Sequence, residues 1–277
     1  MSNKKFENII IASDLDGTYF ADGTKLVQRN IDKVRYFCEN GGKFTFATGR
    51  LPIFTRRAMP NAKELVNLPA VTGNGTCLYD FEKGAAIEEH FLDMKIFREL
   101  AYFLWELAPN AGCRGVVADG LVIPDLDNPY TRAEYYYFPD FMNKRVLPIE
   151  KWDDFNIYKV NIIEEKDVLE RLYPILVENF SDRLTVTRAG YQCIEVMTFG
   201  TSKAKMLERM VRTRFGNDAM LCTVGDHDND IEMHKISDFP VCPANANDAV
   251  KEICKHCLCD NNSGVIADLI DLLDGQV

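Results

Sequence analysis

Apolar residues follow two different periodicities along the chain. Residues 9–12 and 220–224 are short and apolar at nearly every position, which is typical of strands buried on both faces of a parallel sheet. Residues 43–46 are another short segment with strand character. Residues 202–215 instead repeat apolar side chains at helical spacing, namely Met206, Leu207, Met210, Val211 and Phe215. The two ends of the chain therefore predict an α/β fold with a parallel sheet.

The pattern changes in the middle of the chain. Short strands are expected near residues 77–80 and 85–91, and residues 94–107 predict an amphipathic helix. The apolar side of that helix is expected to carry Ile96, Leu100, Phe103, Leu104 and Leu107.

A series of strand and helix signals follows. Asp119-Gly120 between residues 114–117 and 121–124 predicts a hairpin. The remaining expected elements are a strand at 158–163, a helix at 166–180, and strands at 184–187 and 192–197 joined at Ala189-Gly190. This pattern predicts an α+β domain of residues 88–196, inserted into a core domain of residues 1–87 and 197–277.

Carboxylates follow the first buried strand directly. Residues 14–18 have the sequence Asp-Leu-Asp-Gly-Thr, at the sheet edge where α/β folds bind ligands. In an extended chain the side chains of Asp14 and Asp16 lie on the same face. One carboxylate can then attack as a nucleophile while the other transfers a proton. Gly17 permits a sharp turn, and the hydroxyl of Thr18 is expected to hold it.

Three later segments supply groups that suit a phosphate and a metal ion. Thr48 and Gly49 follow the second strand, where a hydroxyl and backbone N–H groups can bind phosphate. Lys203 opens the predicted helix, and its ammonium can neutralise phosphate oxygens. Residues 225–230, Gly-Asp-His-Asp-Asn-Asp, follow the last of these strands and offer the oxygen ligands that Mg²⁺ prefers.

Composition limits the possible partners. The 277 residues carry a net charge of −10, which argues against a nucleic-acid-binding surface. No apolar run reaches the length of about 18 residues that spans a membrane. The nine cysteines and the start of the chain, which lacks a signal-peptide pattern, predict reduced thiols and a cytoplasmic location. Oligomeric state is not indicated.

Together and in this order, the four motifs resemble the haloacid dehalogenase superfamily, specifically Cof-like phosphatases with a type IIB cap. Asn74-Gly75, Asn245-Ala246 and Asn262 with Gly264-Val265 fit the same family. The resemblance runs from Ile9 to about Leu273. It implies a Rossmann-like parallel-sheet core, an inserted α+β cap (type C2B), and hydrolysis of a small phosphorylated metabolite such as a sugar phosphate.

The resemblance also implies a role for each matching residue. Asp14 would attack phosphorus to form an aspartyl-phosphate, and Asp16 would act as general acid and then base. The implied Mg²⁺ ligands are Asp14, the backbone carbonyl of Asp16, and Asp226. The implied phosphate-binding groups are Thr48, Gly49, Lys203 and Asn229. Asp230 would orient metal-bound waters or Lys203 from outside the first coordination sphere.

Two other functions remain open at this stage. The same site could pass the phosphoryl group to a second sugar hydroxyl, as a phosphomutase does. The fold could also serve as a non-catalytic sensor of phosphorylated ligands, although binding alone needs neither nucleophile nor acid. An ion pump is excluded, because Asp16 stands where pumps carry Thr and no membrane span is expected.

Several residues have both a functional and a structural interpretation. Cys254, Cys257 and Cys259 with His256 invite a zinc site, but the segment fits a helix end followed by a short strand better. The aromatic run 135–138 could stack on a substrate or divide between core and surface. Asp228 and His227 could support the metal site, and a solvated loop carboxylate is the favoured reading of Asp228. Arg50 could bind phosphate or form a structural ion pair.

Overall fold

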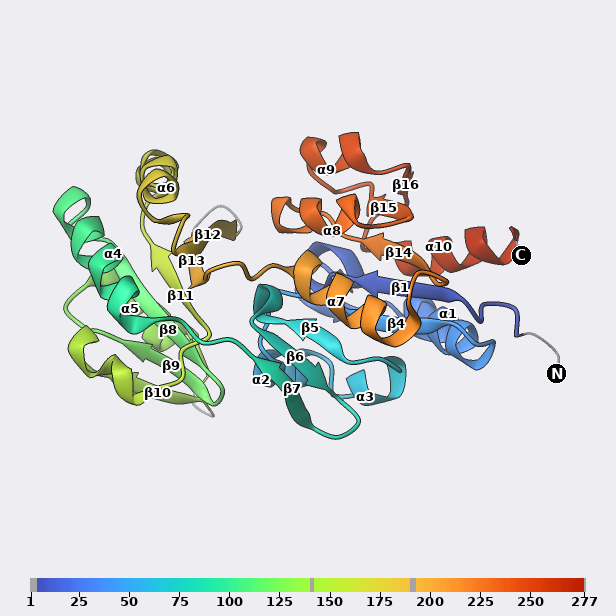
Figure 1. Cartoon of the computed structure of the whole chain (residues 1–277), viewed down its shortest axis with the longest axis horizontal. Coiled ribbons are helices and arrows are strands. Elements are labelled where there is room, and N and C mark those ends of the chain that lie inside the picture. The colour runs from blue at the N-terminus through green and yellow to red at the C-terminus, as the bar shows by residue number, and fades with distance from the viewer. Residues whose placement is uncertain (1–3, 140–141, 190–192, 277) are drawn as a thin grey trace. The chain divides into compact units, whose positions relative to one another are not determined.

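The computed structural model describes residues 4–139, 142–189 and 193–276. Its internal contacts divide the chain into two units, Met1–Glu88 with Ser202–Val277, and Glu89–Thr201. We call the first the core unit and the second the inserted unit (Figure 1). The parallel sheet of the core unit and the α+β insertion confirm the predicted fold class.

A five-stranded parallel sheet forms the centre of the core unit. Its strands lie in the order β16 (His256–Leu258), β15 (Phe239–Pro243), β14 (Met220–Val224), β1 (Ile9–Ser13) and β4 (Lys43–Phe46). Every residue of β1 is buried, as its continuous apolar sequence predicts. A parallel bridge between Ala47 and Val71 continues the sheet from β4 towards β5 (Ala70–Thr72).

Helices cover both faces of this sheet. Ile10 and Ala12 of β1 pack in one apolar cluster with Leu207 and Met210 of α7 (Lys203–Phe215). On the other face, α1 (Gln28–Glu39) and α10 (Val265–Asp274) contact each other, and they also contact β4 and β15 respectively (Figure 1). The sheet is therefore shielded from water, and only its strand ends remain for polar side chains.

The remaining elements of the core unit are short. They are β2 (Phe20–Ala21), β3 (Lys25–Leu26), β6 (Cys77–Asp80), β7 (Ala85–Glu89), α2 (Pro52–Ala58), α3 (Ala62–Leu65), α8 (Ile231–Lys235) and α9 (Asp248–Ile253). Strands β5, β6 and β7 form a separate small sheet, and β2 pairs with β3. In the described part of the chain, no helix combines the length and the apolar character needed to cross a membrane.

The register of the core strands brings three chain segments together. Ser13 of β1 pairs with Val224 of β14 on one side and with Phe46 of β4 on the other. The backbone N–H of Asp14 donates to the carbonyl of Val224 at 2.8 Å. Because the strands are parallel, the residues that follow all three meet at the carboxyl edge of the sheet.

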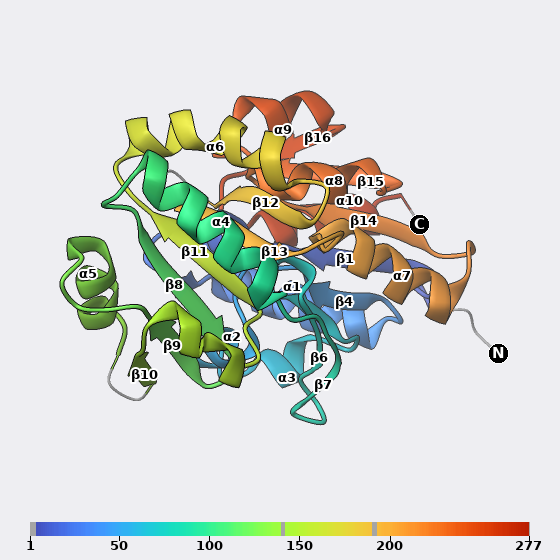
Figure 2. The same ribbon diagram turned by 60° about the vertical axis from the view of Figure 1, so that its left-hand side comes forward.

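A six-stranded sheet organises the inserted unit. Its order is β10 (Asn143–Val146), β9 (Gly120–Ile123), β8 (Gly112–Val117), β11 (Lys159–Ile163), β13 (Cys193–Thr198) and β12 (Leu184–Ala189). All neighbours are antiparallel except β10 and β9. Helices α4 (Met94–Leu107) and α6 (Lys166–Phe180) pack together and against one face of the sheet through a shared apolar core (Figure 2).

Two details of the inserted unit differ from the sequence expectations, and a third lies partly outside the described residues. Leu107 is 48% exposed, because the buried stripe of α4 runs instead through Met94, Phe97, Leu100, Ala101 and Leu104. The hairpin is present, but Val117 pairs with Gly120, so the turn is Ala118-Asp119 and Gly120 belongs to β9. The expected connection at Ala189-Gly190 includes Gly190, and the expected strand start at Gln192 also lies outside the described residues.

Two leucines of α4 test the observed buried face. Leu104→Ala should lower the free energy of unfolding of the inserted unit by about 2–5 kcal/mol, because it leaves a cavity in a closed core. Leu107→Ala, on the same helix, should change it by less than about 0.5 kcal/mol. Both tryptophans, Trp105 and Trp152, lie in the inserted unit, so their fluorescence in a urea titration reports on this unit. Equal losses in the two variants would contradict the observed face.

Candidate active site

Lys203 is a buried cation at the carboxyl edge of the core sheet. It is the first residue of α7, and Ser202 caps that helix by accepting a hydrogen bond from the backbone N–H of Lys205 at 3.3 Å. The ammonium Nζ lies 2.7 Å from Oδ1 of Asp14 and 2.8 Å from Oδ1 of Asp230. Only 1% of the Lys203 side chain is exposed. One cation thus joins the segment after β1 to the segment after β14.

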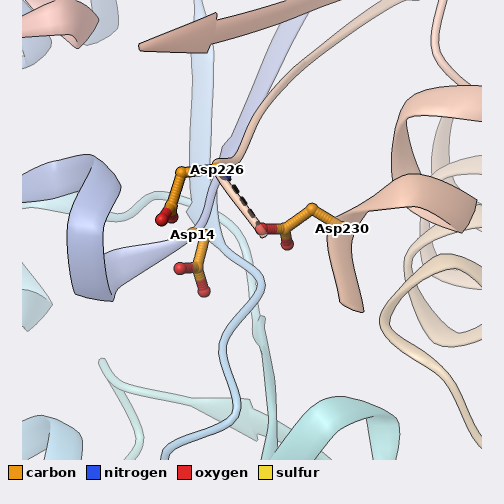
Figure 3. Close-up of side chains that lie close together, drawn as sticks. All are labelled: Asp14, Asp226 and Asp230. Carbon is orange, nitrogen blue, oxygen red and sulfur yellow. Dashed lines mark hydrogen bonds between the residues drawn. The ribbon is translucent and has the colours of Figure 1, made fainter. Parts of the chain in front are cut away.

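Three carboxylates surround this position. Oxygens of Asp14, Asp226 and Asp230 lie within 4.8 Å of one another (Figure 3). Oδ2 of Asp230 accepts from the backbone N–H groups of Asp226 at 3.1 Å and His227 at 3.3 Å. The hydroxyl of Thr18 donates to Oδ1 of Asp226 at 2.7 Å. Thr18 therefore orients Asp226. The sequence analysis expected its hydroxyl to hold the turn after β1 and missed this role.

Burial and mutual repulsion shift the pKa values of these groups. Burial raises the pKa of Asp14 well above its usual value, and the charge of Lys203 offsets only part of that rise. Burial also raises the pKa of Asp226 to about 6, against the hydrogen bond from Thr18. For Lys203, burial alone would lower the pKa, but the charges of Asp14 and Asp230 outweigh it and raise the pKa.

The donor set fits a divalent cation. When ionised, three carboxylates and one ammonium leave two negative charges uncompensated in a buried site. Burial is the main cause of the raised pKa values of Asp14 and Asp226, and the neighbouring carboxylate charges add to it. Clustered carboxylate oxygens are the ligands that Mg²⁺ takes in proteins. Among the residues that the structure describes, these three form the one such group of His, Cys, Asp or Glu.

Gly17 has two reasons to lack a side chain. Its φ of +74° lies in the left-handed region, and a Cβ there would stand 2.5 Å from Oδ2 of Asp226. Its carbonyl accepts from Nδ2 of Asn245 at 2.8 Å. The turn after β1 is thus packed directly against the acidic group.

Asp16 does not join the three carboxylates. Its oxygens Oδ2 and Oδ1 accept from Nε and Nη2 of Arg50 at 2.6 and 2.5 Å, and 54% of its side chain is exposed. The Arg50 guanidinium also lies over the ring of Phe20, 5.5 Å from its centroid. Asp14 and Asp16 both have extended backbone angles, with φ of −65° and −77°, and the charge of Asp16 contributes to the raised pKa of Asp14.

Thr48 and Gly49 follow β4 at the carboxyl edge of the core sheet, and Asn229 follows β14 at the same edge. Thr48 is fully buried, and its Oγ1 accepts from the backbone N–H of Arg50 at 3.1 Å. The hydroxyl proton of Thr48 therefore points away from this N–H. Asn229 lies in the segment after β14, and its Nδ2 donates to Oδ1 of Asn74 at 3.2 Å. Asn74 follows β5, so its contact joins a third strand end to the site.

Asp228 and the cysteine-containing segment 254–259 both have contacts that fit a structural role. Oδ1 of Asp228 accepts from Nδ2 of Asn247 at 2.7 Å, which ties two loops together. Cys254 follows α9, and Cys257 lies in β16, as the helix-end interpretation predicts. The ring of His256 stacks on Phe239, with centroids 4.5 Å apart.

The aromatic run forms part of a helix that the sequence analysis missed. Residues 135–137 end α5 (Pro129–Tyr137), Phe138 is its C-terminal cap residue, and the Asn128 side chain caps its start. Tyr136 and Tyr137 are 72% and 80% exposed. Asn128-Pro129 was the available signal, since Asn at the cap and Pro at the first position favour a helix start.

Comparison with known proteins agrees with this arrangement. Residues 11–270 match the family model of haloacid dehalogenase-like hydrolases. The chain belongs to this family. It is therefore an enzyme of a hydrolase family, and its relatives include proteins named as phosphatases.

Two such relatives have specific names. A 5-amino-6-(5-phospho-D-ribitylamino)uracil phosphatase of Bacillus subtilis is 24% identical, with 96% of this chain and 98% of the relative covered. An HMP-PP phosphatase of Serratia proteamaculans is 23% identical, with coverage of 81% and 79%.

Solved structures share the fold. A HAD/COF-like hydrolase of Plasmodium vivax has a TM-score of 0.81 at 22% identity, covering 98% of this chain and 97% of that chain. A protein of Thermotoga maritima has a TM-score of 0.76 at 22% identity, covering 95% and 97%. At this identity the likeness establishes the fold, including the inserted α+β unit.

Mg²⁺ binding should depend on pH through Asp226. In the metal-free protein its pKa is raised to about 6, so protons compete with the metal below that pH. Affinity for Mg²⁺, measured by calorimetry, should fall about tenfold between pH 7 and pH 5, since one pH unit below the pKa leaves roughly a tenth of the group ionised.

Stability should change in the opposite sense without metal. A carboxyl whose pKa is raised on folding stabilises the fold below its unfolded pKa, and this contribution is lost as the pH rises through 6. The metal-free protein should therefore lose thermal stability between pH 4 and pH 7, and Mg²⁺ should restore it. An Asp226→Asn variant with the same pH dependence as the parent would refute this assignment.

Proposed function

We propose that the protein is a Mg²⁺-dependent phosphatase that hydrolyses small phosphomonoesters through an aspartyl-phosphate on Asp14. The observation that supports this most directly is the buried carboxylate of Asp14 at the end of β1, paired with Lys203 and grouped with Asp226 and Asp230. A buried carboxylate beside cations can stay ionised and attack phosphorus, whereas a binding site for an anion has no use for it.

Phosphate binding is assigned to groups from two strand ends and from the start of α7. The hydroxyl of Thr48, the backbone N–H of Gly49, the ammonium of Lys203 and the carboxamide of Asn229 are the proposed donors to the phosphoryl oxygens. They would stabilise negative charge on these oxygens as the transition state forms. Because such donors are already held in place by the fold, they need little rearrangement during the reaction.

In the first step, Oδ2 of Asp14 forms a bond to phosphorus while the bond to the ester oxygen breaks. Asp16 gives its proton to the departing oxygen, so the alcohol leaves neutral. In the second step, a water molecule attacks the phosphorus of the aspartyl-phosphate. Asp16 takes the proton of that water, and Asp14 is released together with inorganic phosphate.

The Asp14 and Asp226 carboxylates and the backbone carbonyl of Asp16 are the proposed ligands of Mg²⁺. The ion supplies positive charge that lets an anionic nucleophile approach an anionic phosphate. Asp230 would act from outside this set, through its contact with Lys203 and through the two N–H groups of the Asp226 loop that it accepts.

The inserted unit is the proposed cap that selects the substrate. One relative is named as a phosphatase of 5-amino-6-(5-phospho-D-ribitylamino)uracil, a small phosphorylated molecule, and another is named as an HMP-PP phosphatase. A small phosphorylated metabolite is accordingly the proposed substrate class here. The nine cysteines are all free thiols, which supports a reducing compartment such as the cytoplasm as the proposed location.

Substitution of the two aspartates separates their proposed roles. Asp14→Asn should abolish turnover of p-nitrophenyl phosphate, because an amide is neither nucleophile nor anionic ligand. Asp16→Asn should keep the nucleophile and lower kcat by about 10²–10⁴-fold, the usual range for lost acid–base catalysis. Inorganic phosphate release in the presence of Mg²⁺ is the measurement, and circular dichroism checks the fold.

Asp228→Asn is the matched control, since its side chain contacts Asn247 outside the acidic group. It should keep activity within about threefold, as surface changes away from a site do. A chelator should remove activity from the parent, and added Mg²⁺ should restore it. Turnover by Asp14→Asn at the parent's rate would reject the mechanism.

A further inference from the structure

Asn74 has a backbone conformation that residues other than glycine rarely adopt. Within the described ranges, the non-glycine residues with positive φ are Thr24, at 63°, and Asn74, at 56°. Thr24 lies in an exposed turn, whereas Asn74 is 4% exposed. Asparagine tolerates this region better than most residues, but glycine adopts it without strain. A side chain kept here at a cost indicates a role for that side chain.

The turn that carries Asn74 is joined to the loop after β4. The backbone N–H of Asn74 donates to the carbonyl of Thr48 at 3.0 Å, and that of Gly73 donates to the carbonyl of Arg50 at 3.0 Å. A Cβ on Gly75 would stand 2.2 Å from the carbonyl oxygen of Ser202. The turn is thus fixed between the Thr48 loop and the start of α7.

The carboxamide of Asn74 contacts two of the proposed phosphate-binding groups. Its Oδ1 accepts from Nδ2 of Asn229 at 3.2 Å. A Cβ on Gly49 would lie 3.1 Å from Nδ2 of Asn74 and 3.2 Å from its Oδ1, so this carboxamide packs against the backbone of Gly49. One side chain therefore contacts residues from the segments after β4 and β14.

We propose that Asn74 is a positioning residue for phosphoryl transfer, and that it acts by fixing the carboxamide of Asn229. This inference rests on the proposed phosphatase function. By accepting from Nδ2 of Asn229, Asn74 fixes the rotation of that side chain, so that its remaining hydrogen-bonding groups face one direction. A donor held in place before the substrate binds stabilises the transition state more than a donor that must first be ordered.

Asn74→Gly separates this role from a structural one. Glycine keeps the N–H that donates to Thr48 and relieves the backbone strain, but it removes the carboxamide. The free energy of unfolding should stay level or rise, while kcat/KM for p-nitrophenyl phosphate with Mg²⁺ should fall about 10- to 100-fold, a range typical of lost positioning. A residue with only a structural role would lose stability and activity together.

Thr24→Gly is the matched control, because it relieves the same type of strain at an exposed turn. It should raise the free energy of unfolding and leave kcat/KM within about twofold of the parent. A loss of stability in Asn74→Gly, or activity equal to the parent's, would overturn the proposal.

A double-mutant cycle tests whether Asn74 acts through Asn229. In an Asn229→Ala background, Asn74→Gly should lower kcat/KM by less than about twofold further, because the group that it positions is already absent. The same 10- to 100-fold loss in both backgrounds would show that Asn74 acts independently of Asn229, and the proposal would be rejected.

A measurement without turnover separates this inference from the proposed function. Orthovanadate with Mg²⁺ forms an analogue of the phosphoryl group in transfer, and its dissociation constant can be measured by calorimetry. Asn74→Gly should weaken orthovanadate binding about as much as it lowers kcat/KM, and Thr24→Gly should leave it unchanged. A parent protein that binds orthovanadate but releases no phosphate from any ester would reject the proposed function, while the Asn74 variants would still decide the positioning role. Unchanged orthovanadate binding in Asn74→Gly would refute that role.

Discussion

The burial of a lysine ammonium among carboxylates is the constraint on which the rest of the site depends. Lys203 is the first residue of α7, where the helix dipole disfavours a positive charge. Burial disfavours it as well, yet contacts with Asp14 and Asp230 keep it charged. Because removal of one partner would leave uncompensated buried charge, the segments after β1 and β14 and the start of α7 must stay in register. Buried ion pairs of this kind add little to the free energy of unfolding.

Asp14 and Asp16 differ in environment although one residue separates them. Asp14 is buried and has a raised pKa, while Asp16 is half-exposed and held by both arms of the Arg50 guanidinium. Pairs of carboxylates in contrasting surroundings are how enzymes give two identical groups different tasks. In the proposed mechanism Asp16 gives a proton to the departing oxygen, so its ion pair with Arg50 would have to open before the first step.

Much of this architecture could be predicted from the sequence, since buried strands with polar ends have a simple pattern. β1, β14 and α7 lie where their apolar residues place them, and parallel topology then brings Asp14, Asp226 and Lys203 together. The partner of Asp16 could not be predicted, because it depends on the path of the turn that starts at Leu15.

Other misses have different physical causes. Burial of α4 is decided by the sheet and by α6 as well as by periodicity, which is why Leu107 is exposed although its spacing fits the stripe. Helix α5 was hidden by aromatic residues that have strand propensity. The contact of Asn74 with Asn229 joins residues far apart in the chain, and only the folded core brings them together.

The close packing of Gly75 on Ser202 has a consequence for how such enzymes diverge. The chain returns from the inserted unit at Thr201 and meets this contact at the next residue. Ser202 then caps α7, and the ammonium of Lys203 contacts Asp14 and Asp230, which also belong to the core unit. An insertion of another length or fold could end at the same point without moving the ammonium. The contacts that hold Lys203 thus come from residues of the core unit, whichever unit precedes Ser202 in the chain.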